Sequence, residues 1–187
     1  MKYSLITTIY NDVLSVEDCV NSLAPGISPE EGEWVIVDAG SSDGTIVKLR
    51  ELTQKYTCMR VFVVLVEKEV ITRGEGRRIG ASLARGRILI HSIDADLVYV
   101  KGAVDRILHH FDQKGEIPIA GDGYFIITAE EYWENGGHPP LQQEEDFQLY
   151  ERLKKNHRYQ TQVLNVWYQH KDNGIVSQTN PTPWVKS

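Results

Sequence analysis

The sequence predicts an α/β fold in which a mostly parallel sheet is covered by helices on both faces. The first observation is that short, largely apolar segments of strand length alternate with segments whose apolar residues recur at helical spacing. The second is that Gly, Asn, Asp and Ser cluster between these segments, as expected of turns that follow strands. Such alternation is typical of β–α–β units, whose ligands bind beyond the carboxyl ends of the strands.

The first half of the chain shows a regular alternation of strands and helices. The strands are expected at residues 3–9, 34–37, 61–66 and 88–93, and the helices near 16–23, 46–52 and 75–85. Pro25-Gly26 ends the first helix, and Ser42 or Asp43 is expected to cap the second. Gly86 is expected to close the third helix in a left-handed conformation.

The second half has a looser pattern. A helix is expected at 104–111, a strand at 124–128, a short helix at 129–135, a helix at 147–155 and a last strand at 163–168. The segment from Asn173 onward has no regular pattern. No internal repeat or low-complexity linker divides the chain, so a single domain is expected over residues 1–187.

Composition and charge argue against several classes of protein. The 187 residues carry a formal net charge of −6, whereas binding to a nucleic-acid backbone requires a basic surface. The longest apolar run, at 61–66, is far shorter than the ~20 residues of a membrane span. The first residues lead directly into a strand pattern, so no signal peptide is expected. Cys19 and Cys58 are expected to be buried, reduced thiols of a cytoplasmic protein.

Two carboxylates follow the expected strand at 88–93. Because side chains alternate along a strand, Asp94 and Asp96 would project to the same side if the extended geometry continued through them. Two hard oxygen ligands at the end of a buried strand suit Mg²⁺ or Mn²⁺ held together with the phosphates of a substrate. An isolated Asp-x-Asp after a strand is also a common polar loop, so this pattern alone leaves both interpretations open.

Four segments in the first half carry a resemblance to a known family. Thr8-Ile9-Tyr10-Asn11 resembles Pro-Thr-Tyr-Asn, and residues 37–45 resemble Val-Asp-Asp/Gly-Gly-Ser-Thr-Asp-Gly-Thr. Arg77-Arg78-Ile79-Gly80 followed by Ala84-Arg85-Gly86 resembles Arg-Asn-x-Gly and Ala-x-Gly, and Asp94-Ala95-Asp96 matches Asp-x-Asp. In this order the segments resemble the family 2 glycosyltransferases of the GT-A fold, which transfer a sugar from a nucleoside diphosphate to an acceptor.

A fifth, weaker segment extends the resemblance to about residue 155. Gly136-Gly137 and the later pair Glu145-Asp146 resemble the family's Gly-Gly-Phe loop and its Glu-Asp pair before a helix, although no Phe follows Gly137 here. The resemblance implies a GT-A type, Rossmann-like sheet. It also implies a nucleotide-sugar half over about residues 1–100 and an acceptor and catalytic half over about 101–170.

The resemblance implies a donor site at the ends of the first, second and fourth strands. Positions equivalent to Thr8, Tyr10, Asp38 and Asp94 line the nucleoside in the family, and Asn11 belongs to the same segment as Tyr10. Tyr10 would offer an aromatic face to the base, and Asp38 an acceptor for a base N–H. The structural alternatives are ordinary packing for Tyr10 and turn formation for Asp38.

Arginines cluster between residues 73 and 87, although the chain as a whole is acidic. Arg77 occupies the family's arginine position in the first turn of a helix, where a guanidinium and backbone N–H groups can both face an anion. We therefore expect Arg77 to bind the diphosphate of the donor, with Arg73 as a second candidate. Arg78 and Arg85 are expected to be solvated.

The resemblance also implies a divalent metal, Mn²⁺ or Mg²⁺. Asp96 is expected to be the principal ligand, and Asp94 to lie nearer the ribose or to hold the metal through water. His170 follows the last expected strand and is a candidate third ligand, with an ordinary surface histidine as the favoured alternative. The metal would stabilise the charge that develops on the leaving diphosphate.

The catalytic base is expected in the pair Glu145-Asp146. The resemblance implies that Asp146 takes the proton from the acceptor hydroxyl during a single displacement that inverts the anomeric configuration. Glu145 is the next candidate, since the assignment could be displaced by one residue. The structural alternative is that these carboxylates only stabilise the start of a helix.

Three functions compete on the sequence. The first is an inverting, metal-dependent glycosyltransferase that adds a single sugar, because the Gln-x-x-Arg-Trp of processive synthases is absent after Asp146. The second is a non-catalytic module that binds nucleotide sugars, and the third is a sugar-1-phosphate nucleotidyltransferase, whose Gly-rich N-terminal loop is missing. The expected donor is a UDP-, GDP- or dTDP-linked sugar. The acceptor is a sugar, lipid-linked or other hydroxyl, and its recognition is expected to involve a homo-oligomer or a peripheral membrane contact.

Overall fold

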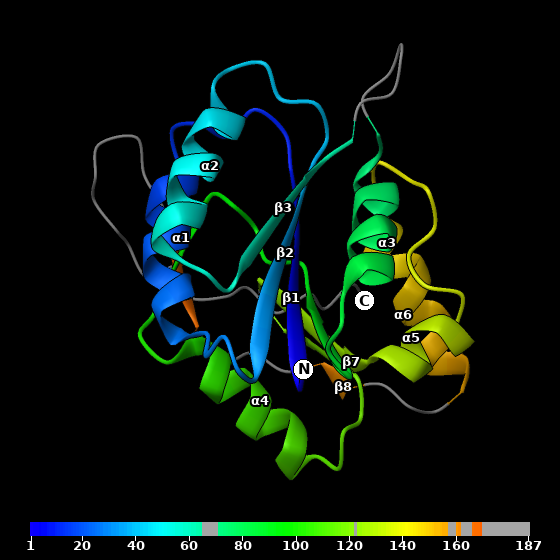
Figure 1. Ribbon diagram of the computed structural model, residues 1–187. Coiled ribbons are helices and arrows are strands. Elements are labelled where there is room, and N and C mark those ends of the chain that lie inside the picture. The colour runs from blue at the N-terminus through cyan, green and yellow to red at the C-terminus, as the bar shows by residue number, and fades with distance from the viewer. Residues whose placement is uncertain (65–70, 122, 157–159, 162–165, 170–187) are drawn as a thin grey trace.

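The computed structural model describes residues 1–64, 71–121, 123–156, 160–161 and 166–169, and its centre is a seven-stranded sheet (Figure 1). The strand order is β3-β2-β1-β4-β7-β6-β8. The strands are β1 (Tyr3–Ile9), β2 (Gly32–Asp38), β3 (Met59–Val63), β4 (Ile88–His91), β6 (Ile119–Gly121), β7 (Tyr124–Thr128) and β8 (Gln160–Thr161). A separate two-stranded sheet pairs β5 (Leu97–Tyr99) with β9 (Trp167–Gln169).

Helices cover both faces of the sheet, as the sequence predicts (Figure 1). On one face lie α1 (Val16–Leu23), α2 (Thr45–Lys55) and α4 (Ala103–Gln113), and on the other lie α3 (Arg73–Leu83), α5 (Ala129–Glu134) and α6 (Glu145–Lys155). A 3-10 turn, Ala24–Gly26, follows α1 where the Pro25-Gly26 pair predicts a helix end. The mixed, mostly parallel sheet confirms the predicted α/β class.

Alternating side chains of the central strands supply the two hydrophobic cores. Leu5 and Ile9 of β1 pack with α1, α2 and α4, whereas Ile6 packs with α3, α5 and α6. On β4, Ile90 faces the first core and Leu89 the second. This alternation is the period-two pattern of a strand that is buried on both faces.

The order of the strands places a switch point between β1 and β4. The chain first builds outward from β1 to β2 and β3 through parallel pairs, and then returns so that β4 lies on the opposite side of β1, again in parallel. Beyond β4 the sheet becomes antiparallel through β7 and β6. In open α/β sheets, the crevice beyond the carboxyl ends of strands at a switch point is where ligands bind.

The strands predicted at 61–66 and 88–93 end earlier than predicted. β3 spans Met59–Val63, and the end of the predicted range falls within 65–70, outside the described residues. β4 ends at His91, because Ser92 has a φ of 58° and cannot continue an extended strand. The strand predicted at 163–168 falls partly on residues outside the described set, and β9 covers Trp167–Gln169.

Two predicted helix ends differ from the observed ones. Gly86 does not adopt a left-handed conformation; a Cβ added there would lie 2.3 Å from the carbonyl carbon of Tyr3, so its role is to let the chain approach β1 closely. The left-handed N-cap of α2 is Gly44, although Asp43 Oδ1 still accepts the backbone N–H of Thr45 at 3.0 Å. Val47 and Phe147, which are apolar residues of the helices predicted at 46–52 and 147–155, are 61% and 55% exposed.

Candidate functional site

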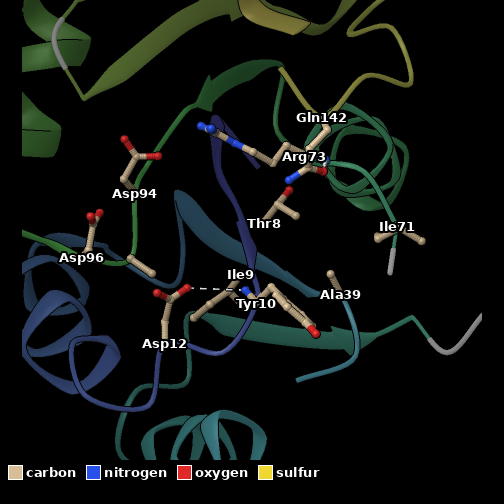
Figure 2. Close-up of a pocket in the computed structure, with 11 residues that line it drawn as sticks. Thr8, Ile9, Tyr10, Asp12, Ala39, Ile71, Arg73, Asp94, Asp96 and Gln142 are labelled. Atoms are coloured by element: carbon tan, nitrogen blue, oxygen red, sulfur yellow. Dashed lines mark hydrogen bonds between the residues drawn. The ribbon is translucent and has the colours of Figure 1, made fainter. Parts of the chain in front are cut away.

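A pocket of about 390 Å³ lies at the switch point, beyond the carboxyl ends of β1, β2 and β4 (Figure 2). It is lined by Thr8, Ile9, Tyr10, Asp12, Ala39, Ile71, Arg73, Asp94, Ala95, Asp96 and Gln142. Figure 2 shows three carboxylates along one side, the ring of Tyr10 with Ala39 on the other, and Arg73 with Gln142 across the top. An aromatic ring, three carboxylates and the guanidinium of Arg73 therefore surround one cavity.

Of the predicted nucleoside-binding residues, Thr8, Tyr10 and Asp94 line the pocket. The ring of Tyr10 is 45% exposed, so it is available for stacking. Thr8 Oγ1 is buried and has no hydrogen-bond partner among the described residues.

Asn11 and Asp38 instead shape the loop after β2. Asn11, with a φ of 55°, donates its backbone N–H to Ser41 Oγ at 2.8 Å and accepts the N–H of Ser42 through Oδ1 at 2.9 Å. Asp38 Oδ1 accepts the N–H groups of Gly40 and Ser41 at 2.9 and 2.8 Å. Turn formation, the structural alternative for Asp38, is thus observed. Its Oδ2 atom is buried without a partner among the described residues.

Asp12 is a pocket residue that the sequence reasoning missed. Its Oδ2 atom accepts the N–H of Tyr10 at 3.4 Å, and its own N–H donates to Thr45 Oγ1 at 2.9 Å. Burial raises the pKa of Asp12; the hydrogen bond from Tyr10 opposes that shift and the charge of Asp96 adds to it. Its position directly after the Tyr10-Asn11 pair was the available signal.

Asp94 and Asp96 both line the pocket, although not for the predicted reason. The strand stops at His91, so the two side chains reach the cavity from a turn between β4 and β5. Asp94 is half-buried and Asp96 is exposed. Burial raises the pKa of Asp94 to about 6; Arg77 opposes that shift and Asp96 adds to it.

The donor set at this turn fits a hard divalent cation. Carboxylate oxygens suit Mg²⁺ and Mn²⁺, which keep several waters and take substrate phosphates as further ligands. Among the described residues, no group of three or more His, Cys, Asp or Glu side chains is arranged to hold a metal. A coordination shell made of two carboxylates, substrate phosphates and water would suit such a cation and would need no third protein ligand. His170 lies outside the described residues.

Arg77 lies behind the pocket, contrary to the prediction that it faces an anion there. It is 4% exposed, and its Nη1 atom lies 2.5 Å from Glu145 Oε1 and 2.7 Å from Asp146 Oδ1. Arg73 is the arginine that lines the pocket; its side chain is half exposed, and its Nε atom lies 3.3 Å from the same oxygen of Glu145. Arg73, the second candidate for the diphosphate site, therefore lines the pocket, whereas Arg77, the first candidate, does not.

Arg78 and Arg85 are exposed but not merely solvated. Arg78 donates to the carbonyl of Gly136 at 2.6 Å, and its guanidinium lies 5.2 Å from the ring centroid of Trp133. Arg85 pairs with the buried Glu33 at 2.7 Å.

Asp146 is held by an ion pair with Arg77 and by hydrogen bonds with His138 and Ser92. Besides Arg77, His138 Nε2 lies 2.9 Å from Oδ1, and Ser92 Oγ lies 3.3 Å from the same atom. Burial raises the pKa of Asp146, but the hydrogen bond from His138 and the charge of Arg77 outweigh it and hold the pKa well below its usual range. His138 was not predicted as a site residue; its position directly after Gly136-Gly137 was the only signal.

Glycines let α3 approach both sides of the site. A Cβ on Gly74 would lie 1.8 Å from the carbonyl oxygen of Pro139, and one on Gly76 would lie 2.2 Å from Thr8 Cγ2. The N–H of Gly74 donates to the carbonyl of Leu141 at 2.9 Å. The segment before α6 is therefore fastened to the same helix that carries Arg73.

The switch-point pocket and the mixed sheet define an α/β protein of the GT-A type. Over residues 4–175 the chain matches the family described as Glycosyl transferase family 2, and it belongs to that family. A comparison with curated protein sequences gives no match.

Solved glycosyltransferases share the fold at low sequence identity. TarS from S. aureus superposes with a TM-score of 0.76 at 19% identity over 90% of this chain. A mannosyltransferase from Pyrobaculum calidifontis, solved with GDP-Man and Mn²⁺, gives 0.74 at 13% over 88%. Glucosyl-3-phosphoglycerate synthase from Mycobacterium tuberculosis, solved with Mn²⁺, UDP-glucose and phosphoglyceric acid, gives 0.71 at 15% over 91%.

The matched proteins are longer than this chain. The alignment covers 36% of TarS, 56% of the mannosyltransferase and 72% of the synthase. None of the helices that the structure describes is both long and apolar enough to cross a membrane.

Proposed function

We propose that this chain transfers a sugar from a nucleoside diphosphate to an acceptor hydroxyl, with inversion and with a divalent metal. The observation that carries the proposal is the pocket itself, which joins Tyr10, Asp94, Asp96 and Arg73 in one cavity. These side chains offer what a nucleotide sugar requires: an aromatic surface for the base, oxygen ligands for a cation and a positive charge for the diphosphate.

In the donor complex, Tyr10 stacks on the base and Thr8 offers its hydroxyl, which has no hydrogen-bond partner in the part of the chain that the structure describes. Asn11 and Asp38 act by holding the loop that carries Ala39 against the pocket. Arg73 binds the diphosphate, taking the role first expected of Arg77. The solved relatives with GDP-Man and UDP-glucose support this class of donor, a UDP-, GDP- or dTDP-linked sugar.

Asp96 and Asp94 would hold Mn²⁺ or Mg²⁺ in this proposal. The bound cation supplies positive charge that stabilises the leaving diphosphate. Relatives solved with Mn²⁺ support the choice of metal.

Asp146 is the proposed base, which accepts the acceptor hydroxyl proton as that oxygen attacks the anomeric carbon. Its side chain is 27% exposed, whereas Glu145 is 3% exposed and engaged by both arginines. Accessibility therefore favours Asp146 over Glu145. Arg77 and His138 keep Asp146 ionised, which is the form of the carboxylate that can accept a proton.

The wider context of the enzyme is part of the same proposal. We propose one domain with a donor half over about residues 1–100 and an acceptor half over about 101–170, and a single sugar addition in the cytoplasm. The acceptor, a sugar or lipid-linked hydroxyl, is recognised together with another copy of the chain or at a membrane surface. The net charge of −6 supports an absence of nucleic-acid partners.

A donor screen tests the proposal. Isothermal titration of UDP-, GDP- and dTDP-sugars with and without Mn²⁺, followed by a donor-hydrolysis assay, is expected to find one metal-dependent donor that is turned over. Asp146→Asn should bind that donor normally but lose turnover by about 10²-fold or more, whereas Glu151→Gln, an exposed change on the same helix, should leave both unchanged. Binding without turnover, unaltered by Asp146→Asn, would instead identify a non-catalytic nucleotide-sugar-binding module.

A further inference from the structure

A chain of buried hydrogen bonds leads from α5 to the carboxylate of Asp146. Tyr132 Oη lies 3.0 Å from His138 Nδ1, and His138 Nε2 lies 2.9 Å from Asp146 Oδ1. The backbone N–H of His138 donates to the same Tyr132 hydroxyl at 3.0 Å. Tyr132 and His138 are both fully buried, so solvent does not compete for these bonds.

The chemistry of the three groups fixes the direction of each bond. An ionised carboxylate can only accept, so His138 Nε2 must carry a hydrogen and donate it to Asp146. The hydroxyl oxygen of Tyr132 already accepts the backbone N–H of His138, so its own hydrogen can be donated to Nδ1; burial lowers the pKa of His138, although Asp146 opposes the shift, and so favours the neutral imidazole that accepts it. One tautomer of His138 therefore satisfies every partner.

His91 packs against this chain without extending it. Its ring stacks on Tyr132 at a centroid distance of 4.7 Å and meets the edge of the His138 ring at 4.9 Å. Neither ring nitrogen has a hydrogen-bond partner among the described residues, and burial holds the pKa of His91 well below its usual range. His91 thus packs as an uncharged ring against Tyr132 and His138 and restricts the movement of both.

The other groups that face Asp146 do not restrain it in the same way. Arg77 on α3 is also engaged by Glu145, and Ser92 after β4 makes contacts of only 3.3 and 3.4 Å. The neighbouring charges are Glu145 on α6 and Asp94 beyond β4. The hydroxyl of Ser92 can rotate, and the guanidinium of Arg77 is shared between Glu145 and Asp146. The ring of His138, fixed at both nitrogens, is the rigid support of Asp146.

We propose that His138 is a positioning residue for Asp146, which it aims through Nε2 while Tyr132 fixes its tautomer. The proposal rests on the proposed function, in which Asp146 accepts the acceptor proton. A base that is misplaced by about 1 Å can cost about 10²-fold in rate, so a rigid support has a measurable effect. The imidazole also keeps Asp146 ionised at lower pH than an unsupported carboxylate.

The first test uses the protein alone and needs no turnover. NMR of the ring nitrogens is expected to show His138 neutral and protonated on Nε2 between about pH 5 and 8, the range in which an ordinary histidine titrates. NMR of the carboxyl carbon of Asp146 is expected to show an upward shift of its titration in His138→Leu and little shift in His138→Gln, whose amide can still donate. A hydrogen on Nδ1, or an Asp146 titration that is the same in all three proteins, would overturn the proposal.

The second test measures transfer with the donor found in the screen. His138→Leu should lower kcat by about 10-fold to 100-fold with donor affinity unchanged, and its rate should fall at higher pH than that of the wild type as Asp146 protonates. His138→Gln should recover most of kcat. Equal losses in both variants with an unmoved pH profile would show a purely structural role. Failure of the wild type to turn over any donor would refute the proposed function. The NMR result would still show whether His138 holds Asp146 through Nε2.

Discussion

The Nη1 atom of Arg77 lies 2.7 Å from Oδ1 of Asp146, which places the charge of α3 directly against the first turn of α6. The same guanidinium contacts Glu145 at 2.5 Å, so one buried cation serves two carboxylates. Arg73, one helical turn earlier, reaches the pocket instead. We therefore expect separable roles for the two arginines, one in folding and one in ligand binding.

Replacement of Arg77 should mainly affect stability. Arg77→Met leaves the buried Glu145 with only the half-exposed Arg73 as a partner, and removal of one member of a buried ion pair costs about 3–5 kcal/mol. Urea unfolding of this variant should show that loss in the free energy of unfolding. Arg73→Met should change it by only about 1 kcal/mol or less, because its pair is half exposed. Equal stability of the two variants would contradict the separation.

Replacement of Arg73 should mainly affect donor binding. A charge-assisted contact to the diphosphate is worth about 1.5–3 kcal/mol, so Arg73→Met should weaken donor binding roughly tenfold or more in a calorimetric titration. Arg78→Met, on the same helix but in contact with Trp133 and Gly136, is the matched control and should bind normally. Unchanged affinity in Arg73→Met would remove Arg73 from the donor site.

Removal of the carboxylate of Asp96 should abolish the metal dependence of donor binding. Asp96→Ala takes away one of the two proposed oxygen ligands, and the described residues hold no group of three or more His, Cys, Asp or Glu side chains arranged to bind a metal without it. Titration of the donor with and without Mn²⁺ should give the same, weak affinity. Asp112→Ala, an exposed change on α4, should retain the Mn²⁺ effect. A retained effect in Asp96→Ala would show that the metal is bound elsewhere.

A methyl group at Gly74 should disturb the contact between α3 and the segment before α6. The added Cβ would lie 1.8 Å from the carbonyl oxygen of Pro139, so one of the two backbones must move. Gly74→Ala should lower the free energy of unfolding by about 1–3 kcal/mol, the usual cost of overpacking. At Gly26 the added Cβ meets nothing within 4 Å, so Gly26→Ala should be close to neutral. Equal effects would mean that the segment adapts without cost.

Glu33 should make folding stability depend on pH at the opposite end of the sheet. Burial raises its pKa, but hydrogen bonds from Arg60, Arg85 and Ser4 outweigh this and lower the pKa to about 2. A carboxyl whose pKa is depressed in the folded state contributes stability above its unfolded pKa of about 4.3. That contribution is lost as the pH falls from there toward 2.

Unfolding curves of the wild type and Glu33→Gln test this dependence. The difference in stability between the two proteins should be constant near neutral pH and should shrink as the solution is acidified through this window. Glu31→Gln, an exposed change directly before β2, serves as the control. If the difference in the free energy of unfolding between the wild type and Glu33→Gln stayed the same in acid, the effect would come from packing and not from the charge of Glu33.

Much of the fold follows from local pattern. β1 and β7 have the predicted bounds, and α4 has the predicted apolar face, because their periodicity is long and unbroken. The three-residue strands β5 and β6 were missed, since segments so short carry no period. The convergence of three loops on one pocket was predicted correctly from the rule that parallel strands end at one edge of the sheet.

The inner part of the site could not be read from local pattern. Arg77 and Glu145 are 68 positions apart, and nothing in either segment shows that α3 turns this arginine inward. The reason lies in its neighbours: Gly76 and Gly80 let α3 lie close against Thr8 and Ile6, and Gly74 lets it lie close against Pro139, so Arg77 is buried beneath the pocket. His138 was missed for a similar reason, because its two partners become neighbours only after folding.

The turn at Ser92 makes the length of the connection between β4 and β5 as important as its composition. Ile93 and Ala95 are buried in the first core, although Ala95 also lines the cavity, whereas the side chains of Asp94 and Asp96 are the polar groups that reach it, so buried and polar residues alternate. Deletion of a single residue after His91 would exchange them: apolar side chains would meet the ligand and carboxylates would enter the core. A homologue or engineered variant that keeps both aspartates but shortens this hinge by one position should therefore be inert.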